Sequence, residues 1–271
     1  MKRTWTVFLL ALVLFIMPAA VTAGPFTPTI ANDTYDTTPD EIPTANDNDD
    51  GTPDIFQAIN RLLGTSYVSN ADIDPYFVEP DYVWQQTLTD GQVALIGMTA
   101  GNSNTLGYYT DLGIGDNKGQ IIGPYSGIYN FLAAGTEEDP YPAAVFNVGV
   151  GTDFGWYLLS SGSVYYSEPG LNPGIPGTNE GLDHMMTFYL PDLKYVWVDY
   201  GNGIGAEKLT LNDPFLMTWE DLPYTSGKLG DEDYDDMIYL FDRIAPIPEP
   251  TTVLLFGAGL IGLWISRKKF K

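Results

Sequence analysis

Between residues 81 and 246 the chain consists of short apolar runs that glycine, asparagine, aspartate and proline interrupt at close intervals. Runs of this length are typical of β-strands, because a strand needs only about five residues whereas a packed helix needs about ten or more. The chain also has 29 glycines and 20 prolines, which suit a fold with many turns. We therefore expect an all-β domain over 81–246, a β-sandwich of a jelly-roll-like kind.

The spacing of the apolar runs also predicts where the strands lie. Turn residues separate the runs, for example at 151–153, 161–163 and 201–203. The predicted strands are 82–89, 93–98, 105–110, 144–150, 156–159, 164–166, 185–189, 195–199, 208–211, 215–219 and 237–241.

The chain contains no cysteine, and its charge is unevenly distributed. Six of the 12 basic residues lie in the two ends, whereas 34 of the 35 acidic residues lie between them, so residues 24–247 have a formal net charge of 6 minus 34, or −28. Such a surface disfavours nucleic acid and anionic lipid as partners and favours divalent cations. Without disulfides, stability must come from the core, helped by bound cations.

Residues 1–23 have the composition of a secretory signal peptide. Lys2 and Arg3 are followed by an apolar run at 7–17, and small residues at 21–23 form a cleavage site. We expect cleavage after Ala23, and an uncleaved anchor is the alternative. The polar residues 24–45 lack apolar periodicity and are expected to form a flexible leader.

An Asp-rich segment at 46–80 begins with Asn-Asp-Asn-Asp-Asp-Gly-Thr-Pro-Asp. Oxygen-bearing side chains alternate here as in loops that wrap Ca²⁺, a hard cation that takes about six to eight oxygen ligands. With Gly51 at the sharp turn, the predicted ligands are Asn46, Asn48, Asp50, the carbonyl of Thr52, and Asp54. Gln57 stands where an EF-hand has its bidentate glutamate. A register shifted by one residue and a plain acidic linker are the alternatives.

Residues 55–63 have apolar side chains at helical spacing, so we expect a short amphipathic helix that ends at Gly64. The loop and this helix together resemble one copy of the calcium repeats of dockerins and of thrombospondin type 3 segments. A dockerin domain needs two copies, so the resemblance implies a calcium loop and not a dockerin.

A second acidic stretch lies at 219–241. An acidic pair is followed by a loop, by Gly-Asp-Glu-Asp-Tyr-Asp-Asp at 230–236, and by an apolar strand. Carboxylates crowded in this way repel one another unless a cation neutralises them. We therefore expect a second calcium site, and a solvated turn is the alternative. Its predicted ligands are Asp231, Asp233 and Asp236, with Glu220 or Asp221 completing the shell.

The last 24 residues combine Pro248-Glu249-Pro250, an apolar run at 251–265 and a basic end, in that order. Proline favours an extended, accessible segment. A helix over 251–265 would be about 22 Å long, and snorkelling basic residues and local thinning would fit it to a hydrocarbon core of about 30 Å. We expect a transmembrane helix within 247–271 with its basic end in the cytoplasm. A permanent anchor and a buried core helix are the alternatives.

This order resembles the PEP-CTERM sorting signal of Gram-negative bacteria. The resemblance implies recognition by exosortase, a membrane transpeptidase of the cysteine type, and cleavage near Pro248-Glu249-Pro250. It also implies transient anchoring in the membrane, release to the cell surface or the extracellular matrix, and a bacterium that makes exopolysaccharide and biofilm.

A second resemblance covers about 170–243. Trp-Glu-Asp-Leu at 219–222, the acidic run at 230–236 and Gly-Leu-Asp-His-Met at 181–185 are similar to the signature of a family of secreted bacterial domains of unknown function. The loop departs from that family at Lys228 and Leu229, where the family tends to glycine. The resemblance implies no particular activity.

The sequence gives little support to an enzyme. His184 is the one histidine, no Gly-x-Ser-x-Gly segment is present, and the adjacent Asp183 would point to the opposite face of a strand. We expect His184 to be structural, with Tyr189 or Asp199 as its hydrogen-bond partner. A glycosidase stays open, because carboxylate separations of about 5 to 9 Å are not visible in a sequence.

We therefore expect a non-enzymatic, calcium-binding, exported protein with a structural or adhesive role. A carbohydrate-binding module for exopolysaccharide is the second hypothesis, and a glycoside hydrolase is the third.

Overall fold

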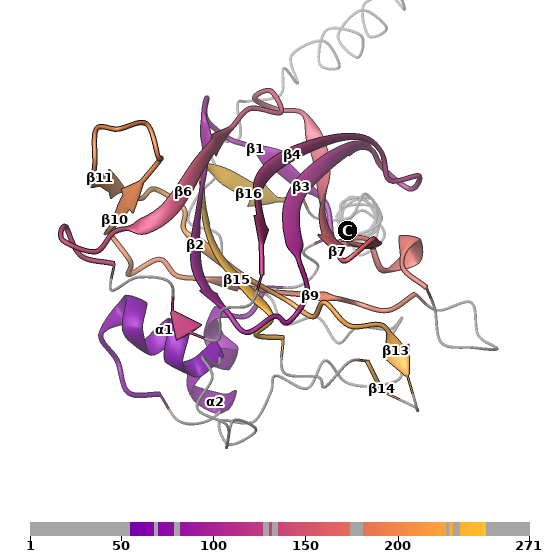
Figure 1. Ribbon diagram of the computed structural model, residues 1–271, viewed down its shortest axis with the longest axis horizontal. Helices are drawn as coiled ribbons and strands as arrows, with labels where there is room; N and C mark the ends of the chain where they lie inside the picture. The colour runs from indigo at the N-terminus through magenta and orange to yellow at the C-terminus, as the bar shows by residue number, and fades with distance from the viewer. Residues whose placement is uncertain are drawn as a thin grey trace, which may run out of the picture.

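The computed structural model of the chain describes residues 55–67, 70–78, 82–126, 130–131, 135–173, 181–225, 228–229 and 234–247. These residues form two β-sheets packed face to face, with one helix against the outer face of the larger sheet (Figure 1). The predicted all-β sandwich is confirmed.

The smaller sheet has six strands in the order β16–β1–β7–β3–β4, with β8 beside β7. Its members are β1 (Trp84–Gln86), β3 (Asn104–Asp111), β4 (Asp116–Tyr125), β7 (Asp153–Ser160), β8 (Ser163–Tyr166) and β16 (Ile244–Pro246).

The larger sheet has eight strands in the order β11–β10–β6–β2–β15–β12–β9, with β5 beside β2. Its members are β2 (Gly91–Met98), β5 (Asn130–Phe131), β6 (Tyr141–Phe146), β9 (Met185–Tyr189), β10 (Tyr195–Asp199), β11 (Glu207–Thr210), β12 (Phe215–Trp219) and β15 (Met237–Asp242). Successive strands pass repeatedly from one sheet to the other. A separate hairpin joins β13 (Tyr224–Thr225) and β14 (Lys228–Leu229).

The core between the sheets follows from alternation along the strands, since every second side chain points to the same face. On β7 the inward side chains are Phe154, Trp156 and Leu158, and on β15 they are Tyr239 and Phe241. The rings of Trp156 and Phe241 meet with their centroids 4.4 Å apart. Each fully buried large side chain contributes roughly 1.5–3 kcal/mol, so this aromatic layer contributes substantially to stability.

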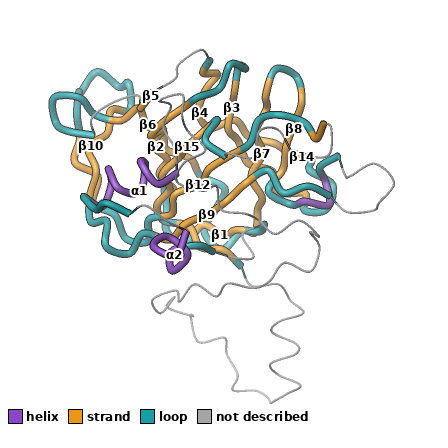
Figure 2. Tube along the Cα trace, turned by 90° about the horizontal axis from the view of Figure 1, so that it is seen from below, coloured by secondary structure: helices purple, strands orange, loops and turns teal. Residues whose placement is uncertain are grey.

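The outer face of the larger sheet is also buried. All eight residues of β2 and all six of β15 are buried, because helix α1 (Ile55–Leu63) packs beside these strands (Figure 2). Ile55 and Ile59 of α1 share a cluster with Ile96 and Leu240. The helix therefore forms a third layer over the larger sheet, which the predicted two-layer sandwich does not include.

Helix α1 spans residues 55–63, so its predicted bounds are confirmed. Gly64 ends it with a φ of +67°, the left-handed conformation that favours glycine after a helix. The N–H of Thr65 donates to the carbonyl of Asn60, which closes the last turn. Helix α2 (Asn70–Ile73) and two 3₁₀ turns, Asp74–Tyr76 and Pro169–Leu171, are the remaining described helices.

One predicted strand was displaced. Sequence analysis placed a strand at 144–150, whereas β6 spans Tyr141–Phe146. Tyr141 and Pro142 extend the strand at its start because they pair in parallel with Val198 and Asp199 of β10, a long-range contact without a local signal.

No helix among the described residues is both long and apolar enough to span a membrane. The predicted signal peptide at 1–23 and the predicted transmembrane helix within 247–271 fall on residues that, apart from 247, lie outside the described part of the chain.

Candidate metal centre

The structure describes three of the residues predicted to bind metal, and it brings these three together. They are Glu220, Asp221 and Asp236. The other predicted metal ligands lie outside the described residues: Asn46, Asn48, Asp50, Thr52, Asp54, Asp231 and Asp233. The predicted cleavage positions Ala23, Pro248, Glu249 and Pro250 lie outside them too.

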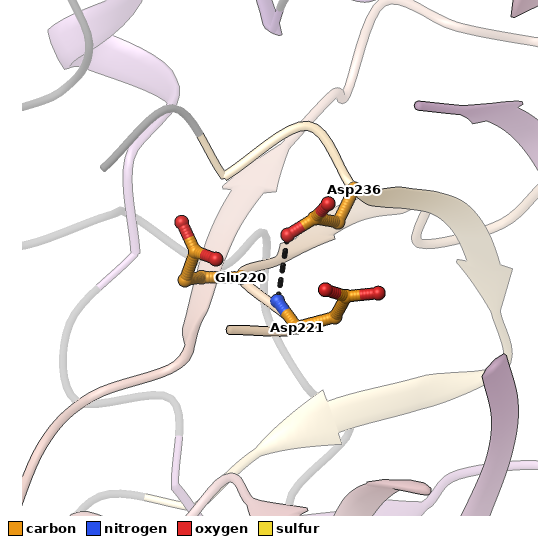
Figure 3. Close-up of side chains that lie close together, drawn as sticks. All are labelled: Glu220, Asp221 and Asp236. Atoms are coloured by element: carbon orange, nitrogen blue, oxygen red, sulfur yellow. Dashed lines mark hydrogen bonds between the residues drawn. The ribbon is translucent and has the colours of Figure 1, made fainter. Parts of the chain in front are cut away.

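Strand pairing positions the three carboxylates. Strands β12 and β15 are antiparallel neighbours, and Trp219 at the end of β12 pairs with Met237 at the start of β15. Glu220 and Asp221 directly follow β12, and Asp236 directly precedes β15, so all three lie at one end of the larger sheet. We call these three residues the acidic trio. One carboxylate oxygen from each lies within 4.8 Å of the others (Figure 3).

The trio is buried and held in place. Glu220 is 0% exposed, Asp221 2% and Asp236 8%. The backbone N–H of Asp221 donates to Oδ2 of Asp236 at 2.7 Å, the contact dashed in Figure 3. The N–H of Leu222 donates to Oε1 of Glu220 at 3.0 Å. These bonds fix the carboxylates before any ligand arrives.

The turn between β2 and β3 closes over the same site. Asn102 Nδ2 donates to Oδ1 of Asp221 at 2.9 Å, and Asn104 Nδ2 donates to Oδ2 of Asp221 at 2.6 Å. In the same turn the hydroxyl of Thr99 donates to Oδ1 of Asp235, and its N–H donates to the carbonyl of Asp236 at 3.2 Å. Three segments distant in the sequence therefore meet at the trio.

The amide of Asn104 also supplies an unsatisfied oxygen. Asn104 is 0% exposed, and its Oδ1 has no hydrogen-bond partner. Since its Nδ2 contacts Asp221, this oxygen belongs to an amide that lies directly against the trio. A buried carbonyl oxygen without a partner costs about 1–3 kcal/mol, which makes it a ready ligand for a cation.

His184 forms hydrogen bonds with the backbone of Glu220, one member of the trio. Its Nδ1–H donates to the carbonyl of Glu220 at 2.9 Å, and the N–H of Glu220 donates to the carbonyl of His184 at 3.0 Å. The imidazole stacks on Tyr165 with ring centroids 4.1 Å apart. Burial lowers the pKa of His184 to about 4, against the opposing effect of the Glu220 carbonyl. His184 is thus a neutral, hydrogen-bonded core residue, and its partner is a backbone carbonyl instead of Tyr189 or Asp199.

The electrostatics of the trio favour a cation. Two full charges 4.8 Å apart repel by about 3 kcal/mol at an effective dielectric constant of about 20. The trio itself offers carboxylate oxygens, which suit a hard cation better than zinc.

The sequence pattern does not indicate that Thr99, Asn102 and Asn104 belong to this site. The polar run at 99–104 resembles any turn between two strands. Its contact with the trio depends on the pairing of β2 with β15, in which Met98 lies opposite Met237.

Comparison with known proteins identifies a sorting motif at the carboxyl end of the chain. Residues 246–269 match the family model of the PEP-CTERM protein-sorting motif. No curated protein and no solved structure matches the chain. The chain therefore carries a PEP-CTERM sorting motif, which marks it as an exported protein that exosortase processes on its way to the cell surface or the extracellular space.

Proposed function

We propose that the exported body is a non-enzymatic protein of the cell surface or exopolysaccharide matrix, with a structural or adhesive role, and that bound calcium stabilises it. The observation that carries the proposal is the acidic trio, three buried carboxylates within 4.8 Å of one another.

Calcium suits the oxygen donors at this site. It takes about six to eight oxygens at about 2.3–2.6 Å, and a carboxylate can supply one oxygen or two. The trio and Oδ1 of Asn104, whose amide contacts Asp221, offer a set of oxygens. Asp231 and Asp233 stay predicted ligands, because the sequence places them just before Asp235 and Asp236.

Calcium at the trio would join three parts of the sandwich. It would tie the end of β12 to the start of β15 and to the turn after β2. A cation that binds only the folded chain stabilises it by about 2.7 kcal/mol when its concentration is 100 times Kd. For a body without disulfides this is a substantial fraction of the whole stability.

The Asp-rich loop at 46–54 stays a predicted second calcium site. It directly precedes α1, whose Ile55 and Phe56 are buried against the larger sheet. Calcium there would order the chain at the point where it joins the core.

The state of His184 supports a non-enzymatic role. A general base needs a pKa near the working pH and access to substrate. His184 is 1% exposed, its pKa is lowered to about 4, and its Nδ1 is engaged with the Glu220 carbonyl.

For the tail we propose that exosortase cleaves near Pro248-Glu249-Pro250 after the segment 251–265 has anchored the chain in the membrane. Replacement of the three residues by alanine should abolish release from the membrane fraction. Unchanged release would contradict cleavage near these three residues and would indicate that the tail is an ordinary membrane anchor.

The calcium-dependent role is tested by limited proteolysis of the protein on intact cells, with calcium and with EGTA. We expect the body to resist cleavage in calcium and to be degraded in EGTA, because loss of the ion frees the turn after β2. Equal protection in both buffers would contradict a stabilising ion. Turnover of a polysaccharide by the purified exported protein would contradict the non-enzymatic role.

A further inference from the structure

Strands β10 and β11 extend beyond the smaller sheet. In the larger sheet they follow β6, and β4, the last strand of the smaller sheet on this side, packs against β6. Figure 1 shows both strands to the left of β6. One side of this strand pair packs with α1 through Val196, Val198 and Leu209. The other side therefore overhangs the end of the smaller sheet.

Strand alternation determines which side chains lie on the overhanging side. Tyr195 and Trp197 alternate with the valines that pack with α1, so both aromatic side chains lie on the opposite side. Thr210 pairs with Tyr195, and Lys208 pairs with Trp197, so two polar side chains stand beside the two aromatic ones. We call these four residues the overhanging face: Tyr195, Trp197, Lys208 and Thr210.

The overhanging face is open to solvent. Tyr195 is 48% exposed, and Trp197 is partly exposed. Lys208 and Thr210 on β11 are exposed. Residues two apart on a strand are separated by about 6–7 Å, so the two aromatic side chains form a short row along β10.

Lys208 restrains the ring of Tyr195. Its ammonium lies 3.6 Å from the centroid of this ring, and a cation–π contact at an exposed site contributes about 0.5–1 kcal/mol. The ammonium covers one face of the ring, yet the side chain keeps 48% of its surface exposed. A ligand therefore meets an aromatic side chain that is already oriented, which reduces the entropy lost on binding.

The charge of this region favours an uncharged ligand. Asp199 lies two residues beyond Trp197 on the same side of β10, and its Oδ1 accepts the N–H of Gly201 at 2.8 Å. Its charge balances that of Lys208, so the two sum to zero. The body between the two ends has 6 basic and 34 acidic residues, and its net charge of −28 repels polyanions.

The mixture of side chains favours a saccharide over a protein partner. The centre of a protein interface is apolar and depleted of charge. On the overhanging face, a lysine and a threonine stand directly opposite the two aromatic residues. A sugar ring matches this mixture, because its C–H face packs on an aromatic ring while its hydroxyls form hydrogen bonds with polar neighbours.

We propose that the overhanging face binds an uncharged polysaccharide. The two aromatic side chains contact neighbouring sugar rings, and the Lys208 ammonium and the Thr210 hydroxyl form hydrogen bonds with the sugar hydroxyls. This inference rests on the proposed matrix role and names the partner of the protein there.

The test is affinity gel electrophoresis of the purified exported protein in native gels. The gels contain hydroxyethyl cellulose, dextran or galactomannan, which are uncharged, or carboxymethyl cellulose, which has the backbone of the first and a negative charge. We expect at least one uncharged polymer to retard the protein, and carboxymethyl cellulose to leave its mobility as in a plain gel. Mobility that no uncharged polymer changes, or retardation by carboxymethyl cellulose as strong as by any uncharged polymer, would overturn the proposal.

Variants then locate the binding. Tyr195→Ala and Trp197→Ala should each weaken binding roughly tenfold, because each removes one aromatic surface. Ile204→Ala is the matched control, since Ile204 is 75% exposed but lies in the loop that joins β10 to β11. Its retardation should equal that of the wild type. If Trp197→Ala melts early, Tyr195→Ala decides, and unchanged retardation of Tyr195→Ala or an equal loss in Ile204→Ala would contradict the assignment.

Two further outcomes separate this inference from its alternatives. Sedimentation at rising protein concentration should show a monomer, and self-association that Tyr195→Ala abolishes would instead make the overhanging face an interface between copies of the chain. A protein that stays on intact cells but is retarded by no uncharged polymer refutes this inference alone. A protein that is retarded in the gel but does not stay on the cells refutes the matrix role alone.

Discussion

Strand β15 has a buried carboxylate at each end, and the two ends satisfy negative charge differently. At its last residue, Asp242 is 1% exposed and accepts the backbone N–H groups of Asn212 and Asp213 at 2.8 and 2.9 Å. Its other oxygen lies 3.6 Å from Nε of Arg243. Just before its first residue, Asp236 instead meets two further carboxylates, Glu220 and Asp221.

This difference between the two ends of β15 indicates which carboxylates only stabilise the fold and which also bind a ligand. At the Asp242 end the carboxylate accepts two backbone N–H groups and faces a guanidinium, and one further carboxyl lies near it, that of Asp213, whose pKa is raised by burial and by the charge of Asp242. Three carboxylates at one point carry mutual repulsion that a divalent cation relieves. We therefore interpret the Asp242 end as structural and the trio end as a cation site, and the following variants compare the two.

The largest effect is expected from Asp236→Asn. The variant removes one charged ligand, so the gain in stability on adding calcium, about 3 kcal/mol at saturating ion, should be lost. Thermal melts in calcium and in EGTA measure this gain. A gain as large as that of the wild type would show that Asp236 is not a ligand.

Acid should lower the free energy of unfolding through His184 by nearly as much as Asp236→Asn removes. Its pKa is lowered from 6.5 to about 4 in the folded chain, so between these values the unfolded state binds more protons. Stability from this group is complete above pH 6.5 and is lost as the pH falls to 4, by about 3 kcal/mol. His184→Gln keeps an N–H donor for the Glu220 carbonyl but does not titrate. Denaturant melts across this window should therefore show a steeper fall for the wild type, and parallel curves would contradict the burial argument.

Asp242→Asn is the control at the other end of β15. It should lower the free energy of unfolding by about 1–3 kcal/mol, because the amide presents a weaker acceptor to two N–H groups and loses the charge that faces Arg243. The loss should be the same in calcium and in EGTA. A loss of stability that differs between calcium and EGTA would contradict the assignment of Asp242 to the fold and of the trio to a cation.

The smallest effect is expected from Asn104→Ala. Loss of one neutral ligand should weaken calcium binding roughly tenfold while the three carboxylates remain. A calcium titration followed by calorimetry measures the change. An unchanged affinity would mean that Oδ1 of Asn104 is not a ligand.

Strands buried by simple alternation could be predicted from the sequence. Strands β9, β10 and β12 have the predicted bounds, since each is an apolar run that turn residues enclose. Strand β4 was not predicted. Its sequence Asp-Asn-Lys-Gly-Gln-Ile-Ile-Gly-Pro-Tyr is mostly polar, because β4 is an edge strand with most of its side chains exposed or partly exposed.

The site was predictable only in part, for a similar reason. Glu220, Asp221 and Asp236 are close in sequence to acidic neighbours, and their crowding signalled a cation. Asn104 is 117 residues from Asp221, and only the pairing of β2 with β15 brings the two together. The partner of His184 is a backbone carbonyl, which every residue possesses and no sequence pattern reveals.

We propose that the acidic trio holds calcium in the exported protein. The most direct measurement is the melting temperature of the wild type in excess EGTA and in calcium, with magnesium as the comparison ion. We predict that calcium raises the melting temperature by several degrees, that magnesium raises it less, and that Asp236→Asn removes the rise. A melting temperature that is the same in EGTA and in calcium would contradict the claim.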